Sequence, residues 1–164
     1  MTTAAINKTS VTPTWKLEKV QQESVRSMVD QMGATMKVIN ELGPEAAKKW
    51  HHAVLEIKIN HFKKLNVKTP IEMVKAMAEF EVNVFGSKIR YWGDEKEAHM
   101  EYEHCACYQA MQDSGCKPSE KEMEVMSKSC AEKMQGLATA FGWTKGEMKF
   151  PTTPNEPAVV TFIK

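Results

Sequence analysis

Apolar residues recur at steps of three and four along the first part of the chain, which is the spacing of helices that bury one face. A first helix is predicted from Val25 to Leu42, and Gly43-Pro44 ends it, because glycine suits a C-terminal cap and proline suits the next helix's first turn. The second helix carries a wide apolar band, which predicts burial on more than one side. This band comprises Trp50, Val54, Leu55, Ile57, Ile59, His61 and Phe62.

A third helix opens at Thr69-Pro70-Ile71-Glu72, which has the pattern of a capping box with proline in the first turn. Gly86 ends this helical region. Two segments of alternating polar and apolar residues follow, Lys88–Trp92 and Ala98–Cys105. Gly93-Asp94 suits a turn between them, so the two segments predict a β-hairpin.

The two faces of this hairpin agree with one register. The apolar face would hold Ile89, Tyr91, Met100 and Tyr102, and the polar face Lys88, Arg90, Glu101 and Glu103. Lys88 and Arg90 would then oppose the two glutamates across the strands, and opposite charges stabilise such a pairing.

The second half of the chain predicts two more helices and a second hairpin. A short helix covers Ala106 to Ser114 and closes at Gly115, and a long helix opens at a capping box, Ser119-Glu120-Lys121-Glu122. The long helix carries an apolar stripe from Met123 to Phe141. Glu147–Phe150 and the β-branched run Ala158–Ile163, with a Pro-rich turn between them, predict the closing strands.

This order of elements predicts an α+β fold. N-terminal helices would pack with an antiparallel sheet built from two hairpins, with a short and a long helix between the hairpins. Residues 1–13 are rich in Thr, Ser, Asn and Pro and predict a flexible N-terminal arm. Residues 14–164 are predicted to form a single α+β domain.

Composition narrows the classes of partner. The 22 basic and 21 acidic residues leave a net charge of +1, which favours neither nucleic acid nor an anionic membrane surface. No run approaches the roughly 18–20 apolar residues of a membrane span. The first residues lack the apolar stretch of a signal peptide, so a cytoplasmic location is expected, with the 4 cysteines as free thiols.

Cys105 is the leading candidate for chemistry. It stands where the second strand gives way to a helix, and the N–H groups of a helix N-terminus stabilise a thiolate. In a strand, Cys105 would share the polar face with His99, Glu101 and Glu103 and would meet solvent there, whereas His104 would point to the other face. A half-buried structural cysteine is the alternative.

Cys130 lies within the apolar stripe of the long helix. It is either a small core residue or part of a cavity wall that faces the hairpin and Cys105. The 12 methionines allow the same two interpretations, a Met-rich core or an adaptable Met-lined ligand pocket.

No cofactor is predicted. Cys105-x-Cys107 lacks the paired spacing of structural zinc sites, and His52 with Glu56 on one helical face lacks a third ligand. A metal held by Cys105, Cys107 and Cys130, or by His52 and Glu56, is the alternative. The row of His99, Glu101 and Glu103 is interpreted as a solvated strand face, or else as the polar wall of a site.

Several residues resemble a known family. They are Tyr102-Glu103-His104-Cys105, Gly115, Ser129-Cys130, Gly142 and the tail through Phe162. With the order of elements, they are similar to the L-2-amino-thiazoline-4-carboxylic acid hydrolase family, small cytoplasmic bacterial proteins, over roughly residues 45–164. Ala106 stands where that family has proline, and Val160-Thr161-Phe162 stands where a further cysteine is common.

The resemblance implies a hydrolase of a small C–N/C–S heterocyclic or amidine-like substrate, by ring opening of a thiazoline-carboxylate type. Cys105 would act as nucleophile or ligand, Glu103 would assist proton transfer, and His104 is a further expected catalytic residue. The expected substrate-binding residues are Cys130, Tyr91, Tyr102, Met126 and Met134.

The alternative is a non-enzymatic small-molecule-binding or accessory module with a Met-rich pocket, similar in architecture to vinyl-reductase-type domains. Both hypotheses imply a small-molecule partner, no nucleic acid and no membrane, and leave a homo-oligomer open.

Overall fold

A computed structural model describes residues 13–114, 120–151 and 156–164. Within these ranges the chain forms five α-helices, one π-helix and four strands. They are α1 (Leu17–Leu42), α2 (Pro44–Lys64), α3 (Pro70–Phe80), the π-helix η1 (Glu81–Phe85), β1 (Lys88–Gly93), β2 (Glu97–His104), α4 (Ala106–Asp113), α5 (Glu120–Ala140), β3 (Lys145–Lys149) and β4 (Ala158–Ile163). The predicted arm over residues 1–13 lies outside the described residues apart from its last position, as do the predicted cap at Gly115 and the start of the Ser119 capping box.

The strands form one antiparallel sheet in the order β1-β2-β4-β3. The two hairpins therefore meet along β2 and β4, and the predicted α+β fold is confirmed. The capping box that opens α3 is confirmed as well: the Thr69 side chain accepts a hydrogen bond from the Glu72 N–H at 3.4 Å, and the Glu72 carboxylate accepts one from the Thr69 N–H at 3.1 Å.

Of the two charge pairs predicted across the first hairpin, the observed strand register contains one and lacks the other. Arg90 pairs with Glu101 across the strands, as predicted. An irregularity between Lys88 and Ile89 shifts the register by one residue, so Lys88 lies opposite His104 rather than Glu103. Arg90 instead forms ion pairs with both Glu101 and Glu103.

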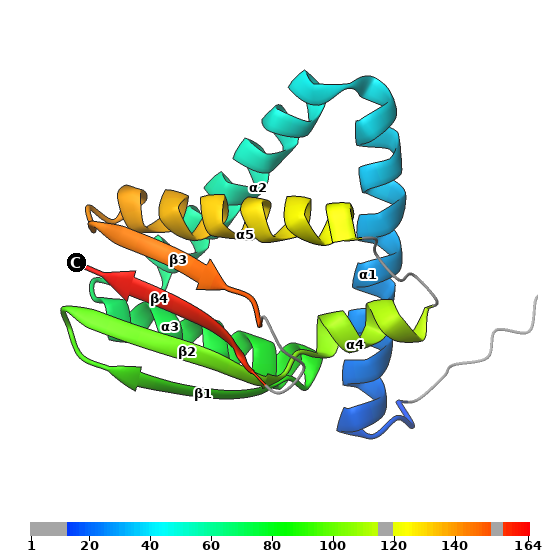
Figure 1. The fold of residues 1–164 in the computed structure, drawn as a ribbon. Coiled ribbons are helices and arrows are strands. Elements are labelled where there is room, and N and C mark those ends of the chain that lie inside the picture. The colour runs from blue at the N-terminus through cyan, green and yellow to red at the C-terminus, as the bar shows by residue number, and fades with distance from the viewer. Residues whose placement is uncertain (1–12, 115–119, 152–155) are drawn as a thin grey trace, which may run out of the picture.

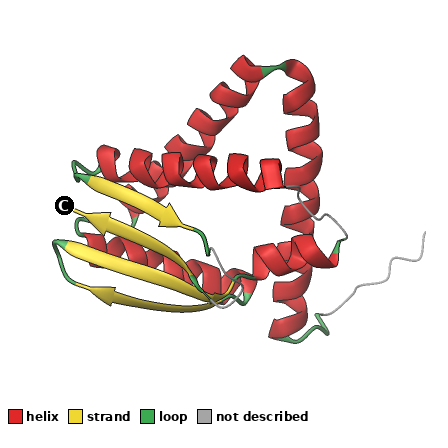
Figure 2. Ribbon diagram, viewed as in Figure 1, coloured by secondary structure: helices red, strands yellow, loops and turns green. Residues whose placement is uncertain are grey.

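One face of the sheet packs against α3 and α5 and forms the main core (Figures 1 and 2). The inward side chains from the sheet are Ala98, Met100, Val160 and Phe162, and those from the two helices are Met73, Val74, Ala78, Met134, Leu137 and Ala138. A smaller cluster joins Val25 and Val29 of α1 to Ala106 at the start of α4. Two apolar clusters therefore flank the turn from β2 into α4.

The prediction that α2 is buried on more than one side is wrong. Phe62 is the buried residue of this helix, and Ile57 is 69% exposed. α2 meets α1 at one end and crosses α5 where Gly136 lies against Leu55, and its upper part leans away from the domain (Figure 1). The first helix likewise buries Val25, Val29 and Ile39 while its end at Leu42 is exposed.

Among the described residues, no helix is both long enough and apolar enough to cross a lipid bilayer. This finding agrees with the absence of a long apolar run in the sequence.

Strand β3 approaches the backbone of α5 closely at Gly146. A Cβ atom at this position would lie 2.1 Å from the Met134 carbonyl oxygen, which is backbone and cannot move aside. The Gly146 N–H donates a hydrogen bond to the Gln135 side-chain oxygen at 3.1 Å. Packing of the closing hairpin on α5 therefore requires glycine here.

We expect Gly146→Ala to lower the free energy of unfolding by about 1–3 kcal/mol or more, because the methyl group would push β3 away from α5. Gly33→Ala is the matched control: a Cβ there meets nothing within 4 Å, and alanine in a helix interior stabilises by about 0.5–1 kcal/mol relative to glycine. Urea denaturation of the two variants measures both. Equal stability of the two variants would contradict the close packing of β3 on α5.

Candidate thiol site

Cys105 marks the point where the chain leaves the sheet. Strand β2 ends at His104, Cys105 has extended backbone angles as the N-cap residue of α4, and its carbonyl accepts the Gln109 N–H at 3.0 Å. The chain turns before Cys105 would continue the strand alternation. Cys105 therefore does not share the polar strand face predicted for it, and it is half-buried instead.

Five side chains from four elements influence one another's ionisation near this turn, and we call them the thiol site. They are Cys105 and Cys107 at the start of α4, Cys130 on α5, Lys58 on α2 and Glu81 on η1. Cys105, Cys107 and Cys130 are all free and half-buried, and their thiols influence one another's ionisation. The thiol of Cys105 adds to the raised pKa of Cys130, and the alternative that places Cys130 across from Cys105 stays a prediction.

Interaction with the Cys107 side chain lowers the pKa of Cys105 to about 7. Burial opposes this shift, whereas the backbone N–H groups of Tyr108 and Cys107 add to it. These N–H groups lower the pKa of Cys105 through the partial positive charge of the helix N-terminus. The Cys105 sulfur accepts no capping hydrogen bond of ordinary geometry from them. The shared proton raises the pKa of Cys107 well above that of an ordinary thiol, and burial adds to that rise.

Glu81 comes from the π-helix that follows α3, a type of distortion that is frequent at functional sites. Burial raises the pKa of the Glu81 carboxyl, and the hydrogen bond from Ser87 and the charge of Lys58 partly offset that rise. The Gln21 side chain on α1 donates to the carbonyl groups of Val82 and Asn83, both at 3.1 Å, and so helps to hold the π-helix in place.

Ser87 connects Glu81 to the start of α4. Its hydroxyl donates to the Glu81 carboxylate at 3.1 Å and accepts the Ala106 N–H at 3.2 Å, and the residue is 3% exposed. Ala106 is the first residue of α4 and directly follows Cys105. The hydroxyl therefore fixes the distance between the carboxylate and the turn that carries the thiol.

Lysines border the site on the α2 and α5 side. The Lys58 side chain is solvent-accessible, yet desolvation by the surrounding protein lowers its pKa. The positive charge of Lys133 lowers the pKa of Lys58 further, and the charge of Glu81 raises it. Burial also raises the pKa of Cys130, while Lys133 and Lys58 counter that rise. Tyr102 closes the site from the sheet, and its pKa is raised by burial and by the nearby Glu81 and thiols.

The other two predicted catalytic residues have other neighbours. Glu103 is exposed and forms an ion pair with Arg90 on the opposite face of the sheet. His104 lines a hollow of about 650 Å³ between α1 and α4. The other residues that line this hollow include Gln21, Arg26 and Gln109. No methionine lines it, so it is not the Met-lined pocket considered from the sequence.

The predicted substrate-binding residues also fall in different places. Cys130 and Tyr102 belong to the thiol site or border it. Tyr91 is 43% exposed on the edge strand β1, Met126 is half-buried on α5, and Met134 is buried in the main core.

The candidate metal ligands on α2 are both on its surface. His52 and Glu56 are both exposed on α2. Over residues 13–114, 120–151 and 156–164, no three His, Cys, Asp or Glu side chains are placed so as to hold a metal ion.

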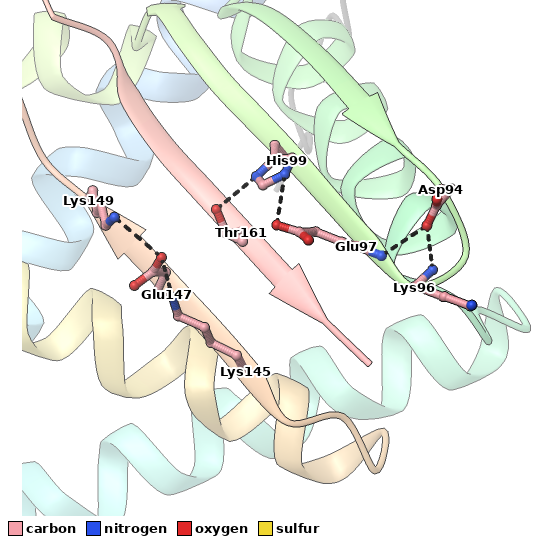
Figure 3. Close-up of polar contacts among 8 residues, drawn as sticks. All are labelled: Asp94, Lys96, Glu97, His99, Lys145, Glu147, Lys149 and Thr161. Carbon is pink, nitrogen blue, oxygen red and sulfur yellow. Dashed lines mark hydrogen bonds and ion pairs between the residues drawn. The ribbon is translucent and has the colours of Figure 1, made fainter.

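The outer face of the sheet carries polar groups that pair with one another (Figure 3). His99 lies 3.0 Å from the Thr161 hydroxyl and 3.3 Å from the Glu97 carboxylate, and its ring stacks on Trp92. Glu147 lies between Lys145 at 2.8 Å and Lys149 at 3.7 Å. These contacts favour the interpretation of this row as a solvated, charge-balanced strand face.

Sequence reasoning did not single out Lys58, Glu81 or Ser87. None of the three belongs to a recognisable sequence motif, and they come close to the thiols only when the chain folds. A weak signal existed for Glu81, since Phe80-Glu81-Val82 places a carboxylate within the apolar run that precedes Gly86.

The comparisons with known proteins give no relative: no protein-family model and no curated protein matches this chain. The function of the chain is therefore inferred from the side chains of the thiol site.

We expect Ser87→Ala to lower the free energy of unfolding by about 1–3 kcal/mol, because it leaves the Ala106 N–H and the Glu81 carboxyl without a buried partner. It also removes a hydrogen bond that lowers the pKa of Glu81, so that pKa rises further. Urea denaturation measures the first effect, with Ser27→Ala on the exposed side of α1 as the control. An equal, small loss in both variants would contradict the connecting role of Ser87.

Proposed function

We propose that this protein is a thiol-dependent hydrolase of a small C–N/C–S heterocyclic or amidine-like substrate, with Cys105 as its nucleophile. The observation that carries the proposal is the pKa of Cys105, which the Cys107 side chain and the α4 N–H groups lower to about 7. A substantial fraction of this thiol is then ionised at neutral pH, and the thiolate is the nucleophilic form. The substrate class rests on the family resemblance.

In the first step, the Cys105 sulfur adds to the electrophilic ring carbon of the substrate and forms a C–S bond. The electron pair of the C=N bond moves to the nitrogen, which takes a proton from the Glu81 carboxyl. A raised pKa suits Glu81 to this role, because the carboxyl stays protonated closer to neutral pH. The lone pair of the nitrogen then re-forms the C=N bond, and the ring C–S bond breaks with sulfur leaving as a thiolate, which opens the ring.

In the second step, water attacks the same carbon while the Glu81 carboxylate takes a proton from it, and the C–S bond to Cys105 breaks. The thiolate and the protonated Glu81 are restored, so the cycle balances. Lys58 is an accessible cation beside the thiols and is suited to pair with a substrate carboxylate. A reducing compartment such as the cytoplasm would keep the thiols free.

The ring-opening rate of 2-amino-thiazoline-4-carboxylate tests the proposal. We expect Cys105→Ser to fold normally and to lose turnover, because a serine hydroxyl is not ionised at neutral pH. Glu81→Gln removes the transferable proton, and we expect it to lower kcat by about 10²–10⁴-fold.

Glu79→Gln is the matched control, since Glu79 is exposed on α3 two residues before Glu81 and pairs with Lys75. Its turnover is expected to equal that of the unmodified protein. Full activity of Cys105→Ser contradicts the nucleophile. Loss of activity in Glu103→Gln, with Glu81→Gln active, contradicts the assignment of Glu81 as the acid and base.

A further inference from the structure

Helix α1 carries a second apolar face that the rest of the described chain does not cover. Val25 and Val29 are buried in the cluster at the start of α4. Val20, Val38 and Leu42 lie on another face of the helix, because an α-helix has 3.6 residues per turn. These three side chains are 44%, 55% and 70% exposed.

Helix α2 has the same arrangement. Leu55, Ile59 and Phe62 pack in or against the main core. Trp50 and Ile57 are seven residues apart and therefore share a different face of the helix. The apolar band of α2 thus includes one face that the core covers and one face, with Ile57, that it leaves open.

The two open faces border one groove. α1 and α2, which we call the helical arm, enclose a groove of about 730 Å³ lined by Val20 and Met32 from α1 and by Trp50 from α2. Among the described residues, Glu23 is the one charged side chain in its lining, and Lys19 forms an ion pair with it. A groove of this kind accepts the apolar face of another helix.

The exposed area of the chain is larger than a monomer of its size requires. The whole chain exposes 11806 Å². If the 21 residues outside the described ranges were as exposed as in an unfolded chain, they would account for about 3,300 Å² of this area. The described residues would then expose about 8,500 Å², whereas a monomeric protein of their mass exposes about 7,500 Å². The excess of about 1,000 Å² matches the area of about 800 Å² that each partner buries in a stable interface.

The charges of the helical arm suit a second copy of the same chain. α1 has four acidic and three basic residues and α2 has two acidic and five basic ones, so their net charges are −1 and +3 with neutral histidines. In a pair related by a twofold axis, α1 of each copy can lie against α2 of the other, which brings unlike net charges together. We propose that the protein is a homodimer in which the helical arms of two copies pack against each other. This inference does not depend on the hydrolase proposal.

In this dimer each groove receives the open apolar face of the partner's arm. Val38, Leu42 and Ile57 leave water when the arms meet, and burial of apolar surface drives the association. Both copies use the same surface, so the assembly closes at two chains.

Sedimentation velocity of the full-length protein, measured over a range of concentrations, tests the proposal. We expect a species with twice the chain mass of 18.6 kDa. Ile57→Glu and Val38→Glu each place a carboxylate in the apolar interface, so we expect each to raise the dissociation constant about tenfold or more. Both side chains are exposed in the single chain, so the variants should fold, and circular dichroism checks this.

Tyr91→Glu is the matched control. Tyr91 is also an exposed apolar side chain, but it lies on the edge strand β1, far from the tip of the arm (Figure 1). This variant is expected to dimerise as the unmodified protein does. The proposal is overturned if the unmodified protein stays at 18.6 kDa at every concentration, or if it forms a stable assembly of any other number than two chains. A dimer that Ile57→Glu and Val38→Glu leave intact also overturns it.

Discussion

The position of the reactive thiol depends on one buried hydroxyl. Ser87 lies between the π-helix and the first strand, yet its oxygen bonds to the first backbone N–H of α4 and to the Glu81 carboxylate. An unsatisfied N–H or carboxyl at this depth would be costly, so the hydroxyl holds three segments together. Among the described residues, no buried side-chain nitrogen or oxygen lacks a partner. The place where β2 turns into α4, and hence the place of Cys105, follows from this contact.

The ionisation states of Glu81, Cys105 and Cys107 in the thiol site depend on one another. A charged Glu81 would raise the pKa of Cys105, but burial favours the neutral carboxyl and so weakens this repulsion. Cys107 stabilises the Cys105 thiolate by donating its own proton. The raised pKa values of Glu81 and Cys107 therefore both favour ionisation of Cys105. This arrangement suits an attack on a carbon atom, because such an attack needs an ionised Cys105 with a protonated neighbour.

Much of the fold could be predicted from local patterns. Gly43-Pro44, the capping box at Thr69 and the alternation of Lys88–Trp92 each set an element that the structure contains. Burial of α2 could not be predicted, because periodicity shows that a helix has an apolar face but not which neighbour covers it. Ile57 belongs to that face and is exposed.

The site was predictable only in its central residue. Cys105 stands out because a cysteine at the start of a helix has a chemical consequence that depends on its immediate neighbours in the chain. Its partners Lys58 and Glu81 are distant in sequence and meet it only after the helices pack. Its orientation was predicted wrongly because strand alternation was carried one residue beyond the end of β2, and a shift of one residue reverses the face.

The alkylation rate of each cysteine in the folded, reduced protein, measured as a function of pH and resolved by peptide mass spectrometry, tests whether Cys105 is the ionised thiol of the site. We expect Cys105 to react first, its rate to rise with a midpoint near pH 7, and Cys107 and Cys130 to react only at higher pH. A midpoint for Cys105 near the ordinary thiol value of about 8.5, or labelling of Cys130 at the same rate, would show that Cys107 does not stabilise a thiolate at Cys105.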